Sequence, residues 1–208
     1  RRLCPCRLGL GVEAGRGFVL RGRLLGGGRL GRLLDDGLVL RLEAAPLVPA
    51  APPAMFYEAL NTILFMREVT QELEGNGNSV LGHLDRILWP CYERDLTEGR
   101  LTRDEARDLL AFFLAFSDVR FGMRSAPARH VGTNTTVIVG GCDASGAVVF
   151  NDLTRLIVEL YIELRLVDPK LNARVSKDHP REYLDLLGRL AAAGTNVTAI
   201  FNDDVIVP

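Results

Sequence analysis

The stretch from Thr135 to Asn151, T-T-V-I-V-G-G-C-D-A-S-G-A-V-V-F-N, constrains the fold of this chain more than any other. Residues 137–139 are β-branched and favour a buried strand, which the two following glycines end. Asp143-Ala144-Ser145-Gly146 predicts a turn, and a second short apolar run covers 147–150. Asn151-Asp152 can then cap a long helix, because a short side-chain oxygen accepts a free backbone N–H.

Upstream of this stretch the sequence predicts mostly helix, because apolar residues recur there at helical spacing. Ser79 can cap the second of these helices through its hydroxyl oxygen. Thr102 and Glu105 form a capping box for the third, in which each side chain satisfies a free N–H beside the other. The helices are expected at about 54–74, at about 80–95 and from Thr102 through at least Leu114, followed by irregular chain at 121–132.

Downstream, helices and short strands alternate. A helix is expected at about 152–165 and is ended by Asp168-Pro169, and a strand follows at 172–176. Pro180 can occupy the first turn of a further helix that ends near Gly194, before a last strand at 197–201. Strands separated by helices of this length imply parallel crossovers, so the sequence predicts an α/β sheet or barrel.

Composition excludes several classes of protein. With 48% hydrophobic residues and a net charge of -1, the chain of 208 residues is expected to be globular, with neither nucleic acid nor a membrane as its partner. No uninterrupted apolar run of about 18 residues is present to span a membrane. The four cysteines are scattered without C-x-x-C spacing, which indicates a reducing cytoplasm and no metal site. His130 and His179 are expected to be surface or loop residues.

Residues 1–51 differ from the rest, being rich in Arg, Gly and Leu and free of Lys. We expect a poorly ordered leader or a segment that is not genuine coding sequence, followed by the folded part at 52–208. Residues 26–31 match G-x-G-x-x-G, but no helix is predicted after them, which argues against a dinucleotide site. Because the chain starts with Arg rather than Met and stops abruptly at Pro208, we expect both ends to be cut.

A series of motifs then resembles one family, the glycyl radical enzymes of the pyruvate formate-lyase and glycerol dehydratase type. The Thr135–Asn151 stretch is similar to the family's T-x-G-G-x-D-x-x-G, and Asn151-Asp152-Leu153-Thr154 to its N-E-L-T. The resemblance extends in register from Met55 to Pro208. The other matching stretches are Glu74–Ser79 with E-S-N-G-H-S, Gly82–Pro90 with G-R-x-D-Q-x-L-Y-P, Asp95–Thr102 with D-L-x-x-G-x-x-[ST], and Phe201–Pro208 with F-N-D-E-x-I-I-P.

The resemblance implies part of a ten-stranded α/β barrel with a helical N-terminal part. It also implies anaerobic chemistry on a small-molecule substrate, in which a C–C, C–O, C–N or C–S bond breaks. In that family an activating enzyme, using S-adenosylmethionine and an iron–sulfur cluster, installs an organic radical on a glycine near the C-terminus. The radical passes to a cysteine in a G-C-V-E-like loop, and the full-length enzymes are expected to be homodimers. This chain stops before both segments, so we predict no catalytic residue, no directly bound cofactor and no activity of the chain alone.

Ser79 is the one substrate-binding residue that the resemblance predicts. It stands at the serine of the N-G-H-S motif, which in several dehydratase-like members faces the barrel interior near the substrate. The alternative is that Ser79 only caps a helix, and both roles can coexist. Asn78 replaces the family's His, His83 its Arg and Gly75 a Ser, so the substrate itself stays open.

The remaining polar and thiol residues are expected to be structural. Cys142 and Cys91 are interpreted as small hydrophobic side chains that fill space. Residues expected to cap helices or satisfy loop N–H groups are Asp85, Asp143, Asn151, Asn202 and Asp203. Two classes of function therefore follow: a fragment of a glycyl radical lyase or dehydratase, or a stand-alone, non-catalytic α/β binding module.

Overall fold

The computed structural model describes residues 52–74, 79–124, 135–194 and 198–206. The chain divides into two units, Arg1–Pro53 and Ala54–Pro208, and every helix and strand described below belongs to the second. The predicted leader at 1–51 and its glycine motif lie outside the described residues.

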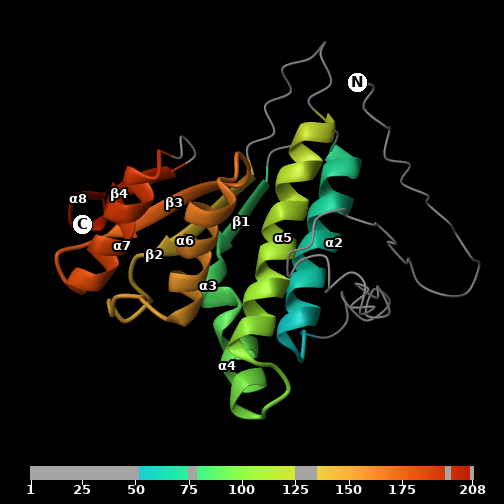
Figure 1. Ribbon diagram of the computed structural model, residues 1–208, viewed down its shortest axis with the longest axis horizontal. Coiled ribbons are helices and arrows are strands. Elements are labelled where there is room, and N and C mark those ends of the chain that lie inside the picture. Colours follow the sequence, from blue (N-terminus) through green and yellow to red (C-terminus); the bar gives the residue numbers. More distant parts are fainter. Residues whose placement is uncertain (1–51, 75–78, 125–134, 195–197, 207–208) are drawn as a thin grey trace, which may run out of the picture. The chain divides into compact units, whose positions relative to one another are not determined.

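Four parallel strands form one sheet in the order β1-β2-β3-β4 (Figure 1). Their bounds are Ser79–His83 for β1, Thr135–Gly140 for β2, Lys170–Val175 for β3 and Thr198–Asn202 for β4. The predicted parallel α/β architecture is confirmed. Strand order follows chain order, so each connection crosses over to the neighbouring strand.

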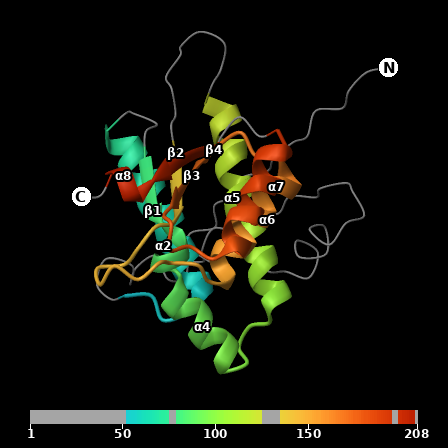
Figure 2. The ribbon, with the colours of Figure 1, turned by 90° about the vertical axis from the view of Figure 1, so that its left-hand side faces the viewer.

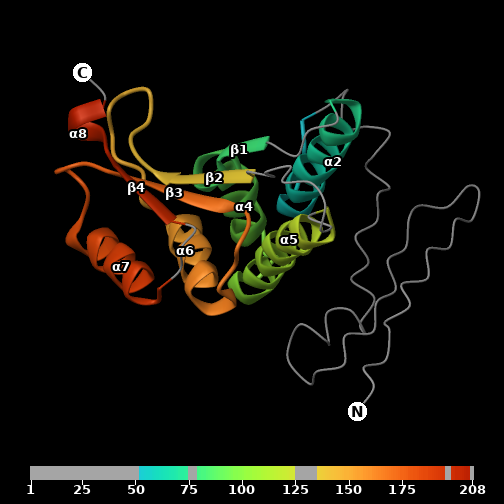
Figure 3. The ribbon, with the colours of Figure 1, turned by 90° about the horizontal axis from the view of Figure 1, so that it is seen from above.

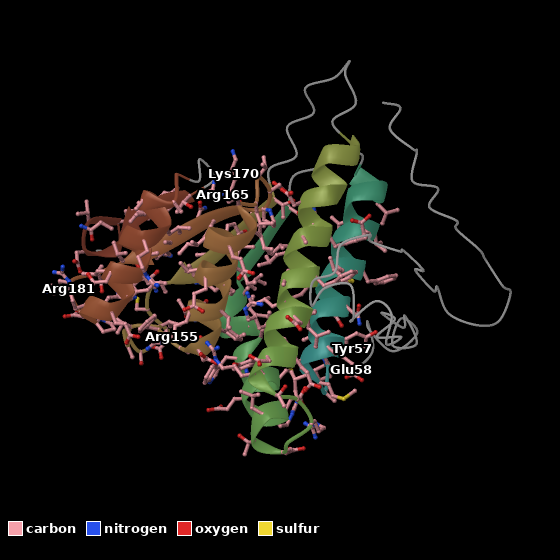
Figure 4. All side chains as sticks on the ribbon, viewed as in Figure 1. Tyr57, Glu58, Arg155, Arg165, Lys170 and Arg181 are labelled. Carbon is pink, nitrogen blue, oxygen red and sulfur yellow. The ribbon has the colours of Figure 1, made fainter. Side chains whose placement is uncertain are left out.

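Helices α6 (Asp152–Leu164) and α7 (Arg181–Ala192) lie along one face of the sheet (Figure 3) and run beside each other (Figure 2). Alternate strand residues on that face are fully buried, among them Val137, Val139, Leu171 and Ala173. Arg155 on α6, which is labelled in Figure 4, also donates to Glu182 on α7 at 2.9 Å.

The helical N-terminal part is also confirmed. Helices α2 (Phe56–Glu74) and α5 (Arg103–Arg124) lie side by side (Figures 1 and 3), and α4 (Trp89–Thr97) joins them at one end. The short helices α3 (Leu84–Ile87) and α8 (Asp203–Ile206) directly follow β1 and β4. One continuous core includes apolar side chains from all the longer helices and from β2 and β3.

The expected helix at 80–95 is wrong in its first four residues, and from Leu84 on it is two short helices, α3 and α4. Residues Ser79–His83 form β1, because they pair in parallel with β2, and only then do α3 and α4 follow. The strand is irregular between Val80 and Gly82, where Gly82 takes a φ of 75°. The apolar run at 147–150 likewise forms no strand, only an isolated bridge between Cys142 and Val148.

Two of the three predicted side-chain caps, those at Asn151 and at Thr102 with Glu105, are confirmed. Asn151 Oδ1 accepts from the amide of Thr154 at 2.9 Å, and Thr154 Oγ1 accepts from the amide of Asn151 at 3.2 Å. Glu105 accepts from the amide of Thr102 at 2.8 Å, and α5 continues to Arg124, beyond the expected start of irregular chain. Pro180 is the N-cap of α7 rather than a residue of its first turn.

Candidate functional site

Ser79 is the first residue of β1, at the amino-terminal edge of the sheet. It pairs with Thr135, the first residue of β2, and the two hydroxyl oxygens lie 3.4 Å apart. Ser79 is half-buried and Thr135 is fully buried. The interpretation of Ser79 as a helix cap is wrong, because the next helix begins at Leu84 with His83 at its N-cap.

Two buried, oppositely charged side chains, Arg67 and Asp168, lie next to the Thr135 hydroxyl. Arg67 of α2 donates through Nη2 to Thr135 Oγ1 at 3.0 Å, and the same nitrogen lies 3.9 Å from Asp168 Oδ2. Asp168 is 1% exposed. Burial raises the pKa of Asp168 to about 6, although Arg67 and the neighbouring Thr135 oppose that rise. Arg67, Ser79, Thr135 and Asp168 are called the amino-edge cluster.

The loop that carries Asp168 is fixed from two further helices. Asp118 of α5 accepts from the amides of Val167 and Asp168 at 2.8 and 2.7 Å. The Tyr161 hydroxyl of α6 donates to the carbonyl of Pro169 at 2.8 Å. The amino-edge cluster is therefore held by α2, by β1 and β2, and by a loop anchored to α5 and α6.

At the opposite, carboxyl edge of the sheet, Asp85 joins three segments. Its Oδ2 accepts from the amide of Gly140 at 2.8 Å and from Thr154 Oγ1 at 2.9 Å. Its carbonyl accepts from Asn151 Nδ2 at 2.9 Å. The side chain is fully buried, and this burial raises the pKa of Asp85 to about 6. Asp85 thus ties α3 to the end of β2 and to the start of α6.

The turn after β2 can form only with glycine at its first position. Gly140 has a φ of 72°, and a Cβ on it would lie 2.6 Å from the carbonyl oxygen of Arg174 and against the Tyr183 hydroxyl. That hydroxyl donates to the same carbonyl at 3.1 Å. The chain therefore needs glycine here both for its backbone angle and for space.

Further charged groups lie along the carboxyl edge. Arg86 donates to the carbonyl of Cys142 at 3.1 Å, and Arg174 Nε donates to Asp203 Oδ1 at 2.7 Å. Burial lowers the pKa of His83, and the charges of Arg86 and Arg174 lower it further. His83 is therefore a neutral imidazole near pH 7.

Most of the residues expected to satisfy local N–H groups do so. Asp143 accepts from the amides of Ser145 and Ala147, Asn202 accepts from the amide of Asp204, and Asp203 holds Arg174 instead. The sequence gives no signal for the two non-local partners of Asp85, which come from β2 and α6. The roles of Arg67 and Asp168 were likewise not predicted, because only the fold brings them close to Thr135, the strand partner of Ser79.

His179 lies in a loop, as expected, and is buried there, since it is 5% exposed with its ring 4.7 Å from that of Tyr183. Cys91 is a buried core residue, as predicted. Cys142 differs from the prediction, because it is half-buried at the turn and outside the core. Gly75, Asn78 and His130 lie outside the described residues.

Within the described ranges, no cluster of three or more His, Cys, Asp or Glu side chains could hold a metal ion. None of the helices in those ranges combines the length and the apolar character needed to cross a bilayer.

Comparison with known proteins identifies the family. The model of the pyruvate formate lyase-like family matches residues 43–208, which include every described helix and strand. The chain belongs to this family. The resemblance to glycyl radical enzymes read from the motifs is confirmed.

Curated relatives have related names but are far longer. Trans-4-hydroxy-L-proline dehydratase of Clostridioides difficile is 29% identical over 180 residues, covering 82% of this chain and 22% of the relative. Isethionate sulfite-lyase of Nitratidesulfovibrio vulgaris is 29% identical over 172 residues, which cover 80% of this chain and 21% of the relative. This chain therefore spans about a fifth of the length of these relatives.

Solved structures agree. A glycyl radical enzyme from Archaeoglobus fulgidus matches with a TM-score of 0.68 and 29% identity, over 76% of this chain and 21% of that one. Hydroxyproline dehydratase from Clostridioides difficile matches with a TM-score of 0.69 and 28% identity, over 79% of this chain and 22% of the dehydratase chain. The parallel sheet and its helices are a portion of the α/β barrel of glycyl radical enzymes.

Proposed function

We propose that this chain forms part of the barrel wall of a glycyl radical lyase or dehydratase, which cleaves a C–C, C–O, C–N or C–S bond of a small substrate. The observation that carries the proposal is the family match over 43–208, with relatives named as dehydratases and lyases. The chain's own contribution is structural and substrate-facing, through the two edges of its sheet.

Ser79 is the residue that we assign to substrate contact. Its place in the N-G-H-S-like motif supports this role, as does its position at a strand end rather than in a helix cap. A half-buried hydroxyl beside the buried Thr135 is also held in one place, which a binding group needs. At the other edge, Asp85 and Gly140 keep the turn after β2 rigid.

We assign the radical chemistry itself to parts of the full-length enzyme other than this chain. In the full-length enzyme a glycyl radical supplies hydrogen abstraction, and an activating enzyme with S-adenosylmethionine and an iron–sulfur cluster installs it. We place this enzyme in a reducing cytoplasm as a homodimer, and we expect this chain alone to be inactive. The free thiols of Cys91 and Cys142 fit that setting.

The test is to sequence the parent locus and to express the whole reading frame that contains this chain under strict anaerobiosis with an activating enzyme. Electron paramagnetic resonance should then detect a glycyl radical, and one of four probes should be consumed: trans-4-hydroxy-L-proline, isethionate, 1,2-propanediol or glycerol. A frame that ends at Pro208 and yields no radical would overturn the proposal in favour of a stand-alone binding module.

A further inference from the structure

The loop between β3 and α7, residues 176–180, is closed by one imidazole side chain. The Ser176 amide donates to His179 Nδ1 at 3.0 Å, and the Ser176 hydroxyl oxygen lies 3.1 Å from the same nitrogen. The backbone closes the same turn, because the His179 amide donates to the Ser176 carbonyl at 3.2 Å. The loop directly follows Val175, the last residue of β3, and so lies at the carboxyl edge of the sheet.

The Ser176 amide fixes the protonation state of this ring. A backbone N–H can only donate, so His179 Nδ1 has to offer it a lone pair and can carry no hydrogen of its own. The ring is therefore neutral and carries its one N–H hydrogen on Nε2, which is buried as well. The hydrogen bond seen in the structure thus exists only while His179 is uncharged.

A proton added to Nδ1 would exchange the partners of the ring. The new Nδ1–H can no longer accept from the Ser176 amide, but it can donate to the Ser176 hydroxyl oxygen, which lies within hydrogen-bond distance at 3.1 Å. The amide then loses its acceptor, and a positive charge is placed on a residue that is only 5% exposed. Both changes weaken the closed loop.

We propose that His179 is a pH-sensitive latch, which holds the loop between β3 and α7 closed while its ring is neutral and releases the loop when Nδ1 is protonated. The ring lies 4.7 Å from that of Tyr183, whose hydroxyl donates to the carbonyl of Arg174 beside the Gly140 turn. Release of the loop therefore also loosens the packing at the carboxyl edge of the sheet. This inference goes beyond the proposed function and does not depend on it.

The surroundings of the ring set the direction in which pH acts. Burial lowers the pKa of His179. The groups that oppose this fall are the backbone of Val149 and of Ser176 and the carboxylates of Asp203 and Asp178. On α7 the ring faces Tyr183, whose hydroxyl stays protonated because burial raises its pKa. Since the folded pKa of His179 is lowered, the stabilising effect of the latch is full above the ordinary pKa of 6.5 and is lost as pH falls through the folded value.

NMR of the whole chain tests the latch, by following the titration of the His179 ring and the hydrogen exchange of the Ser176 amide in the same samples. The midpoint of the ring should lie below that of the chain unfolded in urea. As His179 takes up its proton, the protection factor of the Ser176 amide should fall about tenfold, the effect of losing one hydrogen bond. A midpoint at or above the unfolded value, or an amide whose protection does not follow the ring titration, would overturn the inference.

Two variants separate the latch from other effects of pH. His179→Asn is the matched control, because its side-chain oxygen can still accept from the Ser176 amide but cannot take up a proton, so the protection factor should stay constant. Asp85 titrates in the same range in both proteins, and its effect cancels in the comparison. Ser176→Ala removes the hydroxyl that would accept from the protonated ring, so it should lower the His179 midpoint further. An unchanged midpoint in Ser176→Ala would contradict the exchange of partners, and this variant keeps the test open if His179→Asn does not fold.

Discussion

Asp85 Oδ2 accepts the backbone N–H of Gly140 at 2.8 Å, and this one contact joins the helix after β1 to the end of β2. The same oxygen also accepts from Thr154 at the start of α6. Asp85 therefore links the segments that follow two neighbouring strands, although it lies 55 residues from Gly140 in the sequence. The turn at Gly140-Gly141, which closes the carboxyl edge of the sheet, depends on this side chain.

Replacing Asp85 with Ala should destabilise the fold by about 3 kcal/mol. The change leaves the Gly140 amide and the Thr154 hydroxyl buried without their acceptor, and each such loss costs roughly 1–3 kcal/mol. Urea unfolding followed by circular dichroism measures the effect. Asp143→Ala, at an exposed turn residue with only local hydrogen bonds, is the control and should cost well under half as much. Equal effects would show that Asp85 does not hold the sheet edge.

The pKa of Asp85 predicts a loss of stability as pH rises. Its folded pKa of about 6 lies above its ordinary value of 3.8, so the folded state binds the proton more tightly than the unfolded state. The stability from this proton is full below about pH 4 and is lost as pH rises through 6, a total of about 3 kcal/mol.

Urea unfolding of wild type and Asp85→Asn from pH 4 to 7.5 measures this contribution, because the amide cannot titrate. The difference in unfolding free energy between the two proteins should change by about 2.4 kcal/mol across that range, with the wild type losing more. Other carboxyl groups titrate in both proteins and cancel in the difference. Parallel pH profiles would contradict the raised pKa.

Gly140→Ala should be far more damaging than Gly146→Ala. Both glycines have positive φ, 72° and 85°, so alanine is strained in the backbone at both positions. Only at Gly140 does the added Cβ collide with the Arg174 carbonyl and Tyr183, because nothing lies within 4 Å of the corresponding position at Gly146. We expect about 1 kcal/mol for Gly146→Ala and at least about 3 kcal/mol for Gly140→Ala in thermal or urea unfolding. Similar losses in the two variants would show that space at Gly140 is not limiting.

Local sequence signals predicted the helices and strands whose ends depend on nearby residues. Asn151 caps α6 through Thr154, three residues away, and Thr102 and Glu105 begin α5 in the same way. The β-branched run at 137–139 likewise became the buried centre of β2. In each of these elements the decisive interaction lies within one helical turn or one short strand.

The failures depend on partners distant in sequence. Ser79–His83 has no strong strand pattern, and it becomes β1 because β2, more than 50 residues later, offers it a ladder of hydrogen bonds. The amino-edge cluster could not be predicted for the same reason, since Arg67 meets Thr135 68 residues along the chain. Ser79 itself was found only through its family motif.

The most direct test of the account is the turnover of the anaerobically activated full-length enzyme that contains this chain, compared between wild type and Ser79→Ala at equal glycyl radical content. Equal radical content, measured by electron paramagnetic resonance, separates substrate contact from radical installation. The account predicts that Ser79→Ala retains the radical and loses about ten- to a hundredfold in kcat/KM, the cost of one hydrogen bond to substrate. Wild-type kcat/KM in the radical-bearing Ser79→Ala enzyme would contradict it.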